Sequence, residues 1–209
     1  MHEEIKGQLR QIELNYNGKV FRDIVSRVKK ERINDDELLD RIENISRKRF
    51  REKVSFKLNV RAGNLLELVI AIAAVVIAFE ASSDWMLYIT ALVLMTTLHP
   101  LSHFATGTIF GIRFTHYYLN GPARIEPTLR IDYSTYLKAS GKRRSLMHVS
   151  GVVGTVAAPI IAGLIALDKG ASAVALNLGI LFLVLIVFEL LTSTKIGDLM
   201  KAKREYDYR

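Results

Sequence analysis

Four long apolar segments constrain this chain more than any other feature of its sequence. They cover about residues 65–79, 85–110, 148–167 and 174–191, and half of the 209 residues are hydrophobic. A helix of about 20 apolar residues can cross the roughly 30 Å hydrocarbon core of a bilayer. Only helices and closed barrels satisfy their backbone hydrogen bonds inside lipid. The sequence therefore predicts a mainly α-helical integral membrane protein with four transmembrane helices.

Residues 1–62 form the first of two predicted units, a cytoplasmic region of amphipathic helices. They hold 16 Lys and Arg and 11 Asp and Glu, with no long apolar run. Apolar side chains recur in them at helical spacing, for example Phe21, Ile24 and Val28. Because two such helices bury little apolar surface alone, we expect them to pack on each other, on the membrane surface, or on a second copy of the chain in a homodimer.

Residues 63–209 form the second predicted unit, a transmembrane core that is interrupted by a β-rich insert at 111–147. Within the insert, two stretches rich in β-branched and aromatic residues flank the sequence Asn120-Gly121-Pro122. Strand-forming segments separated by Asn, Gly and Pro are typical of a β-hairpin. We therefore expect a small β-hairpin at the cytoplasmic face of the membrane.

The distribution of charge predicts the orientation in the membrane. The segment before the first span, the insert and the C-terminal tail are basic, whereas the short loops at 80–84 and 168–170 hold one Lys and three acids. Because cytoplasmic loops carry an excess of Lys and Arg, we expect a multi-pass protein with both termini in the cytoplasm. The net charge of +8 then reflects contact with membrane lipids, and no nucleic acid partner is expected.

The segment His99-Pro100-Leu101-Ser102-His103 is the most informative motif of the core. Two His four residues apart share one face of a helix and can bind one metal ion, as in the HExxH zinc motif. Pro100 lacks a backbone N–H, so a kink or a restart of the helix is expected there. The spacing alone leaves two interpretations: a metal site, or two polar side chains that donate hydrogen bonds to backbone carbonyls.

The order of these elements resembles the site-2 protease family of intramembrane zinc metalloproteases, over about residues 85–200. The HxxxH helix is followed by Gly107, the β-rich insert, the small-residue stretch from Gly151 to Thr155, and an acid in Gly197-Asp198. The resemblance implies a site-2-protease-like core that acts on a transmembrane protein or a lipid.

The resemblance also implies that His99, His103 and Asp198 bind a zinc ion. Two His and one carboxylate leave the fourth position of a tetrahedral zinc site open for water. The chain departs from the family at two places. Pro100 replaces the Glu that activates the water, and residues 196–199 read Ile-Gly-Asp-Leu in place of the usual Leu-Asp-Gly, without the usual Asn-x-x-Pro.

Three further residues are candidates for the site. His116 in the insert and His148 at the start of the third span are accessory ligands or proton donors, or else ordinary surface histidines. Glu189, near the end of the fourth span, is the leading candidate for a substitute general base; the alternative is a structural role with polar neighbours.

Three functions remain open at this point. The first is a non-proteolytic or repurposed relative of the site-2 proteases that keeps the zinc, because loss of a general base costs about 10²–10⁴-fold in rate. The second is an active metalloprotease or other membrane metallohydrolase with another base, such as Glu189. The third is a metal-free membrane anchor for the N-terminal helices.

Overall fold

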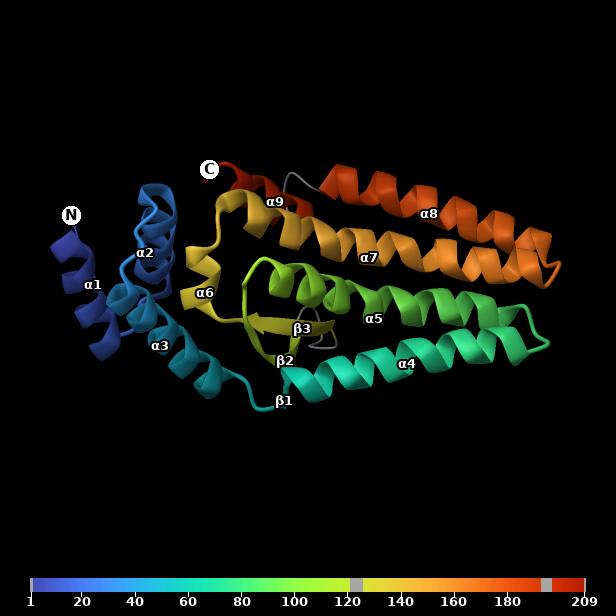
Figure 1. Ribbon diagram of the computed structural model, residues 1–209, viewed down its shortest axis with the longest axis horizontal. Coiled ribbons are helices and arrows are strands. Elements are labelled where there is room, and N and C mark those ends of the chain that lie inside the picture. Colours follow the sequence, from blue (N-terminus) through green and yellow to red (C-terminus); the bar gives the residue numbers. More distant parts are fainter. Residues whose placement is uncertain (1, 121–125, 193–196, 209) are drawn as a thin grey trace.

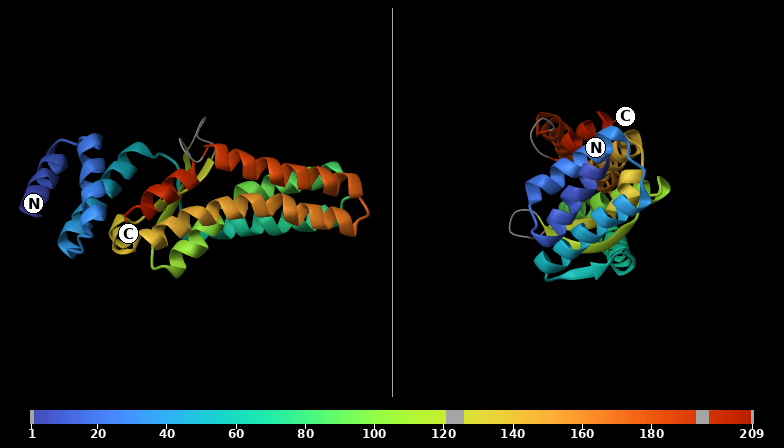
Figure 2. Two further views of the ribbon diagram at one scale, coloured as in Figure 1. Left: turned by 90° about the horizontal axis from the view of Figure 1, so that it is seen from above. Right: turned by 90° about the vertical axis from the view of Figure 1, so that its left-hand side faces the viewer.

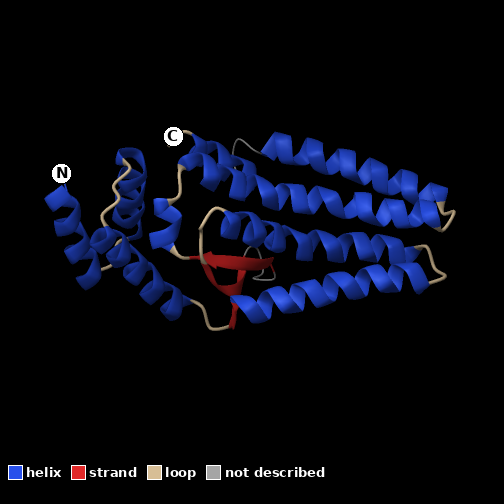
Figure 3. Cartoon of the chain, in the orientation of Figure 1, coloured by secondary structure: helices blue, strands red, loops and turns tan. Residues whose placement is uncertain are grey.

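The computed structural model describes residues 2–120, 126–192 and 197–208, and it is mostly helical with one small antiparallel sheet (Figure 3). The predicted turn at Gly121-Pro122 lies outside the described residues. Within the described part, four helices are long and apolar enough to cross a membrane, as predicted. They are α4 (Val60–Glu80), α5 (Trp85–Ile109), α7 (Gly141–Asp168) and α8 (Ser172–Thr192).

These four helices lie side by side as an elongated bundle (Figure 1). The short connections α4–α5 and α7–α8 are at one end of the bundle. The N-terminal helices, the sheet, α9 (Asp198–Tyr206) and both chain ends are at the other end, as Figure 2 also shows. The basic segments of the sequence are thus gathered at one end of the bundle.

Small side chains allow the helices of the bundle to approach closely. The most extensive contact is between α5 and α7, where a Cβ on Gly154 would lie 2.5 Å from the Leu98 carbonyl oxygen. The outward sides of the bundle remain apolar, and Leu66, Leu164 and Leu183 are all more than half exposed. Exposed apolar surface of this kind is expected for helices that face lipid.

Two of the four helices begin five or more residues earlier than predicted, and one is more continuous. α4 begins at Val60 because Asn59 accepts a hydrogen bond from the Arg61 N–H at 2.9 Å and caps the helix. α7 begins at Gly141, capped by Ser140. α5 runs through Pro100 as one helix, so the expected restart is not present. Proline removes only one N–H donor, and membrane helices tolerate that loss.

The predicted hairpin is confirmed as β2 (Phe114–Asn120) and β3 (Glu126–Ile131), which pair antiparallel. A short strand that the sequence did not predict, β1 (Lys57–Asn59), pairs with the other side of β2. The Tyr117 hydroxyl donates to Asn64 Oδ1 at 2.8 Å, and a Cβ on Gly63 would overlap the Tyr117 ring. These contacts attach the sheet to the first turns of α4.

The N-terminal region contains α1 (His2–Leu14), α2 (Gly18–Glu31) and α3 (Asp36–Lys53). Their apolar faces pack on one another and on residues of the insert, in a core that includes Leu9, Ile24, Leu38 and Met147. Of the three packing partners considered for these helices, the described residues show the first, the helices themselves. This core also includes Tyr136 and Leu137 of α6 (Tyr133–Lys138).

Candidate metal centre

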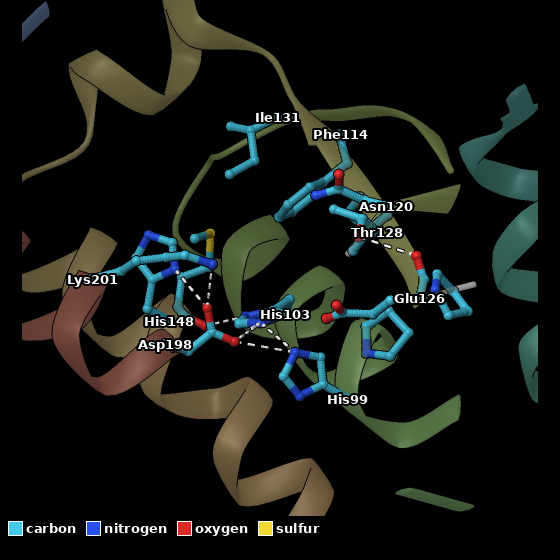
Figure 4. Close-up of a pocket in the computed structure, with 14 residues that line it drawn as sticks. His99, His103, Phe114, Asn120, Glu126, Thr128, Ile131, His148, Asp198 and Lys201 are labelled. Carbon is cyan, nitrogen blue, oxygen red and sulfur yellow. Dashed lines mark hydrogen bonds and ion pairs between the residues drawn. The ribbon is translucent and has the colours of Figure 1, made fainter. Parts of the chain in front are cut away.

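The three residues implied as zinc ligands come together at the end of the bundle that carries the sheet (Figure 4). His99 and His103 lie one turn apart on α5, and Asp198 is the first residue of α9. Gly197 precedes it with a φ of 89°, a conformation that glycine adopts at little cost. Residues nearly 100 positions apart in sequence therefore meet at one point.

The three facing atoms are spaced like the ligands of one small cation. Asp198 Oδ2 lies 3.1 Å from His99 Nε2 and 3.0 Å from His103 Nε2, and the two Nε2 atoms are 3.2 Å apart. Ligand atoms around a tetrahedral zinc ion, with bonds of about 2.0–2.1 Å, are about 3.3–3.4 Å apart. The three distances fit such a site after a small expansion.

Hydrogen bonds on the far side of each ring fix which nitrogen is free to bind. His103 Nδ1 lies 2.6 Å from the Met147 carbonyl oxygen, which can only accept, so Nδ1 carries the hydrogen. His99 Nδ1 lies 2.9 Å from Thr155 Oγ1, and the Thr155 hydroxyl itself donates to the Gly151 carbonyl at 3.2 Å. His99 Nδ1 is therefore also the donor.

In the neutral rings, both Nε2 atoms consequently present lone pairs toward the Asp198 carboxylate. When both rings are neutral, three electron-pair donors face one another at this point. Metal sites have this arrangement, with outer hydrogen bonds that orient each imidazole. Hydrogen bonds to backbone carbonyls alone do not explain why each ring has its second nitrogen at Asp198.

The Asp198 side chain is ionised although it is buried. Burial alone raises the pKa of this carboxyl, but its contacts with the imidazoles of His103, His148 and His99 lower it by more, and the net pKa is well below the ordinary value. Lys201 Nζ binds the other carboxylate oxygen, Oδ1, at 2.8 Å. The oxygen that faces the two imidazoles, Oδ2, is thus an anionic ligand atom.

The structure brings His148 to the centre and leaves His116 elsewhere. His148 Nδ1 is 3.8 Å from Asp198 Oδ1, and its Nε2 is 3.1 Å from the Tyr136 hydroxyl. His116 lies on β2, with its ring 5.7 Å from that of Phe50, and it does not line the cavity at the centre. Of the two accessory candidates, His148 is the one positioned beside a ligand.

Glu189 lies beside the chain that leads to Asp198. Its Oε2 would be 3.9 Å from a Cβ on Gly197. It is not among the described residues that line the cavity with the two histidines. The structure therefore places this candidate base next to the centre, outside the cavity wall.

A cavity of about 180 Å³ opens beside the three facing atoms, between α5, the hairpin and α9. Its lining includes His99, His103, Asp198 and also Glu126 of β3, a residue that the sequence did not single out. Figure 4 shows the Glu126 carboxylate directed toward the two imidazoles. One signal could have identified it, since Glu126 is the only acid in residues 111–131.

Gly151 on α7 gives the His103 ring its space. A Cβ on Gly151 would overlap Nε2 and Cε1 of that ring. Any larger residue would displace the imidazole from its position beside Asp198. The small-residue character of this stretch, predicted from sequence as a helix-packing feature, is thus also a property of the metal centre.

No family model, curated protein or solved structure matches the chain in the comparisons made with each. The functional assignment therefore depends on the geometry of His99, His103 and Asp198 and on the cavity beside them.

Proposed function

We propose that the chain is a multi-pass membrane zinc metallohydrolase of the site-2 protease type. One observation carries the proposal: two imidazole nitrogens with lone pairs and one ionised carboxylate oxygen converge within 3.0–3.2 Å of one another. His99, His103 and Asp198 would hold the ion. A His₂-carboxylate set suits zinc with an open fourth position, whereas magnesium prefers oxygen ligands.

A zinc ion held by these residues would supply an activated water, with a pKa of about 7, and a Lewis acid for a substrate carbonyl. The protein side chains hold the ligands in position around it. Met147 and Thr155 orient the two imidazoles through their outer nitrogens, and Lys201 binds the Asp198 oxygen that is turned away from the rings. Residues of β2 and β3 form the opposite wall of the cavity.

We place the sheet, α9 and both termini on the cytoplasmic side. The basic segments at this end of the bundle support that orientation, because positive charge is retained in the cytoplasm. Substrate bonds would then be reached near the cytoplasmic surface of the membrane, in a transmembrane protein or a lipid.

Pro100 favours a second function, a non-proteolytic relative that keeps the zinc and binds a transmembrane or lipid partner. At this helical position the related proteases carry the acid that moves protons, and proline cannot do so. The two functions share the metal centre and differ only in turnover.

Metal analysis of the detergent-purified protein tests the shared part. We expect one zinc ion per chain in the wild type, and loss of the ion in His103→Ala and in Asp198→Asn. His116→Ala is the matched control, since His116 is a histidine outside the cavity, and it should retain the ion. A wild type that neither contains nor takes up a stoichiometric transition metal would favour the metal-free anchor. A site that holds ferrous iron in place of zinc would favour an oxygen-dependent enzyme over a hydrolase.

Cleavage of a single-span fluorescent peptide distinguishes the two zinc functions. The metallohydrolase requires cleavage that stops on addition of a chelator and returns with zinc. A zinc-loaded protein with no cleavage of peptides or lipid esters supports the non-proteolytic relative.

Cysteine labelling tests the orientation, because the chain contains no cysteine. Ser82→Cys lies in the α4–α5 connection and should react with a membrane-impermeant maleimide only from outside the cell. Reaction only from the cytoplasmic side would invert the proposed topology.

A further inference from the structure

We propose that Glu126 is a catalytic residue that accepts the proton of the attacking water and delivers it to the leaving group, the role that Pro100 cannot perform. The inference rests on the proposed metallohydrolase function, with a peptide amide as the bond that is hydrolysed. It assigns the base to the hairpin, and it replaces Glu189, the base expected from the sequence.

The position of Glu126 is the first argument. The residue lines the same cavity as His99, His103 and Asp198. Figure 4 shows its carboxylate directed at the imidazole pair, on the side away from Asp198. A substrate carbonyl in the cavity would therefore lie between the metal ligands and this carboxylate. From there the carboxylate faces the water that attacks the carbonyl, and a general base must reach that water.

The other ionisable groups of the cavity have partners already. Lys201 binds Asp198 Oδ1 at 2.8 Å, and His148 lies between Asp198 and the Tyr136 hydroxyl. Within the described residues, Asp198 and Glu126 are the carboxylates of the cavity lining. Glu126 is also solvent-exposed, so its carboxylate can exchange a proton with water.

The strand that carries Glu126, β3, lies at the edge of the sheet and is held by β2 on one side. Glu126 pairs with Asn120 across the hairpin, and the Thr128 hydroxyl donates to the Glu126 backbone carbonyl at 3.3 Å. Further along β3, Arg130 Nη2 donates to Glu43 Oε1 of α3 at 2.7 Å. The hairpin therefore presents Glu126 from a supported strand, as a catalytic group requires.

The proposed step balances as a hydrolysis. Water transfers one proton to the Glu126 carboxylate while its oxygen bonds to the amide carbonyl carbon. The carbon–nitrogen bond then breaks, and the proton moves from Glu126 to the leaving nitrogen. The products are a carboxylic acid and an amine, and the Glu126 carboxylate is regenerated.

The test compares Glu126→Gln with Glu189→Gln, two isosteric removals of a carboxylate near the centre. We expect Glu126→Gln to lower kcat by about 10²–10⁴-fold, with one zinc per chain retained and KM little changed. Glu189→Gln should keep the wild-type rate. In Glu126→Ala, added formate should restore part of the rate, because it can carry the missing carboxylate into the space that the side chain leaves.

A spectroscopic measurement provides a readout besides turnover. Cobalt(II) in place of zinc gives a visible spectrum whose pH dependence reports ionisation at the centre. We expect its midpoint to shift in Glu126→Gln and not in Glu189→Gln. Three results would overturn the inference: a wild-type rate in Glu126→Gln, loss of metal from that variant, or an unchanged cobalt midpoint. A wild type that binds no metal would instead overturn the proposed function itself.

Discussion

The two buried carboxylates of α9 have opposite surroundings. Asp198 begins the helix, and Glu205 follows seven residues later, two turns along the same helix. Glu205 forms ion pairs with Lys29 of α2 and, at 2.7 Å, with Arg144 of α7. Asp198 faces two imidazoles through one oxygen and Lys201 through the other. One helix therefore holds a carboxylate between two buried cations and a second that faces one cation, Lys201, and two imidazoles.

The comparison shows how a structural acid differs from a candidate metal ligand. Burial raises the pKa of Glu205, but Lys29 and Arg144 lower it by a larger amount. The group is therefore ionised, and its charge is balanced within the protein. The cations are themselves covered by Tyr136, whose ring centroid is 4.9 Å from Lys29 Nζ and 5.5 Å from the Arg144 guanidinium. Around Asp198, Lys201 pairs with one carboxylate oxygen, and the other oxygen faces two oriented imidazoles, which is where a metal ion could be held.

Removal of the Glu205 charge should have the largest effect on stability. Glu205→Gln leaves Lys29 and Arg144 buried without a counter-ion, and we expect the free energy of unfolding to fall by about 3–5 kcal/mol. Denaturant unfolding in detergent measures this loss. Glu52→Gln, which removes an exposed partner of Arg49, is the control and should cost less than about 1 kcal/mol. Equal losses in the two variants would mean that the buried ion pairs of Glu205 contribute no more to stability than the exposed pair of Glu52.

The same ion pairs predict a direction for the effect of pH. Because the pKa of Glu205 is lower in the folded than in the unfolded protein, its stabilisation is complete above the ordinary carboxyl pKa. The stabilisation is lost as the pH falls through the lower, folded value. The acid-induced decrease in stability should therefore be smaller in Glu205→Gln than in the wild type.

Loss of an outer hydrogen bond at the centre should have an intermediate effect. Thr155→Val removes the oxygen that accepts from His99 Nδ1, and we expect zinc affinity to fall by about 10–100-fold while the fold is retained. Competition with a chromophoric chelator measures the affinity. Thr90→Val is the matched control, because the Thr90 hydroxyl bonds the Ala74 carbonyl at the α4–α5 contact, away from the cavity. An unchanged affinity in Thr155→Val would mean that the imidazole orientation is irrelevant to binding.

The smallest effect is expected for the contact between Tyr208, which follows α9, and Ser26 of α2. Tyr208→Phe removes the 2.8 Å hydrogen bond between the Tyr208 and Ser26 hydroxyls, which should lower the free energy of unfolding by about 1 kcal/mol. Zinc content should not change. A double-mutant cycle with Ser26→Ala measures the pair, and a coupling near zero would show that α2 is held to α9 by Glu205 and Lys29 alone.

The four apolar helices could be predicted because composition alone decides whether a segment is stable in lipid. The histidine pair could also be predicted, since residues four apart share a helix face whatever the rest of the fold. Asp198 was implied only by the family resemblance, because nothing local in the sequence aims its side chain at α5.

Contacts between segments far apart in the chain could not be predicted from the sequence. Lys29 lies next to Lys30 in a basic stretch, and its partner Glu205 is 176 residues away. Glu126 reaches the cavity because β1 pairs with β2 and Tyr117 attaches the sheet to α4. Those pairings involve residues that are neighbours only in the folded protein, so the spacing of residue types along the sequence does not predict them.

Gly151 has a consequence for the recognition of distant relatives. A motif built on ligands would contain the two histidines and the aspartate, three positions that recur by chance in many chains. The His103 ring occupies the volume that a side chain at residue 151 would fill, so the glycine and the histidine are tolerated only together. A signature that requires HxxxH on one span and a glycine on the facing span should select true relatives, and a bulky residue at that glycine should mark chains that have lost the centre.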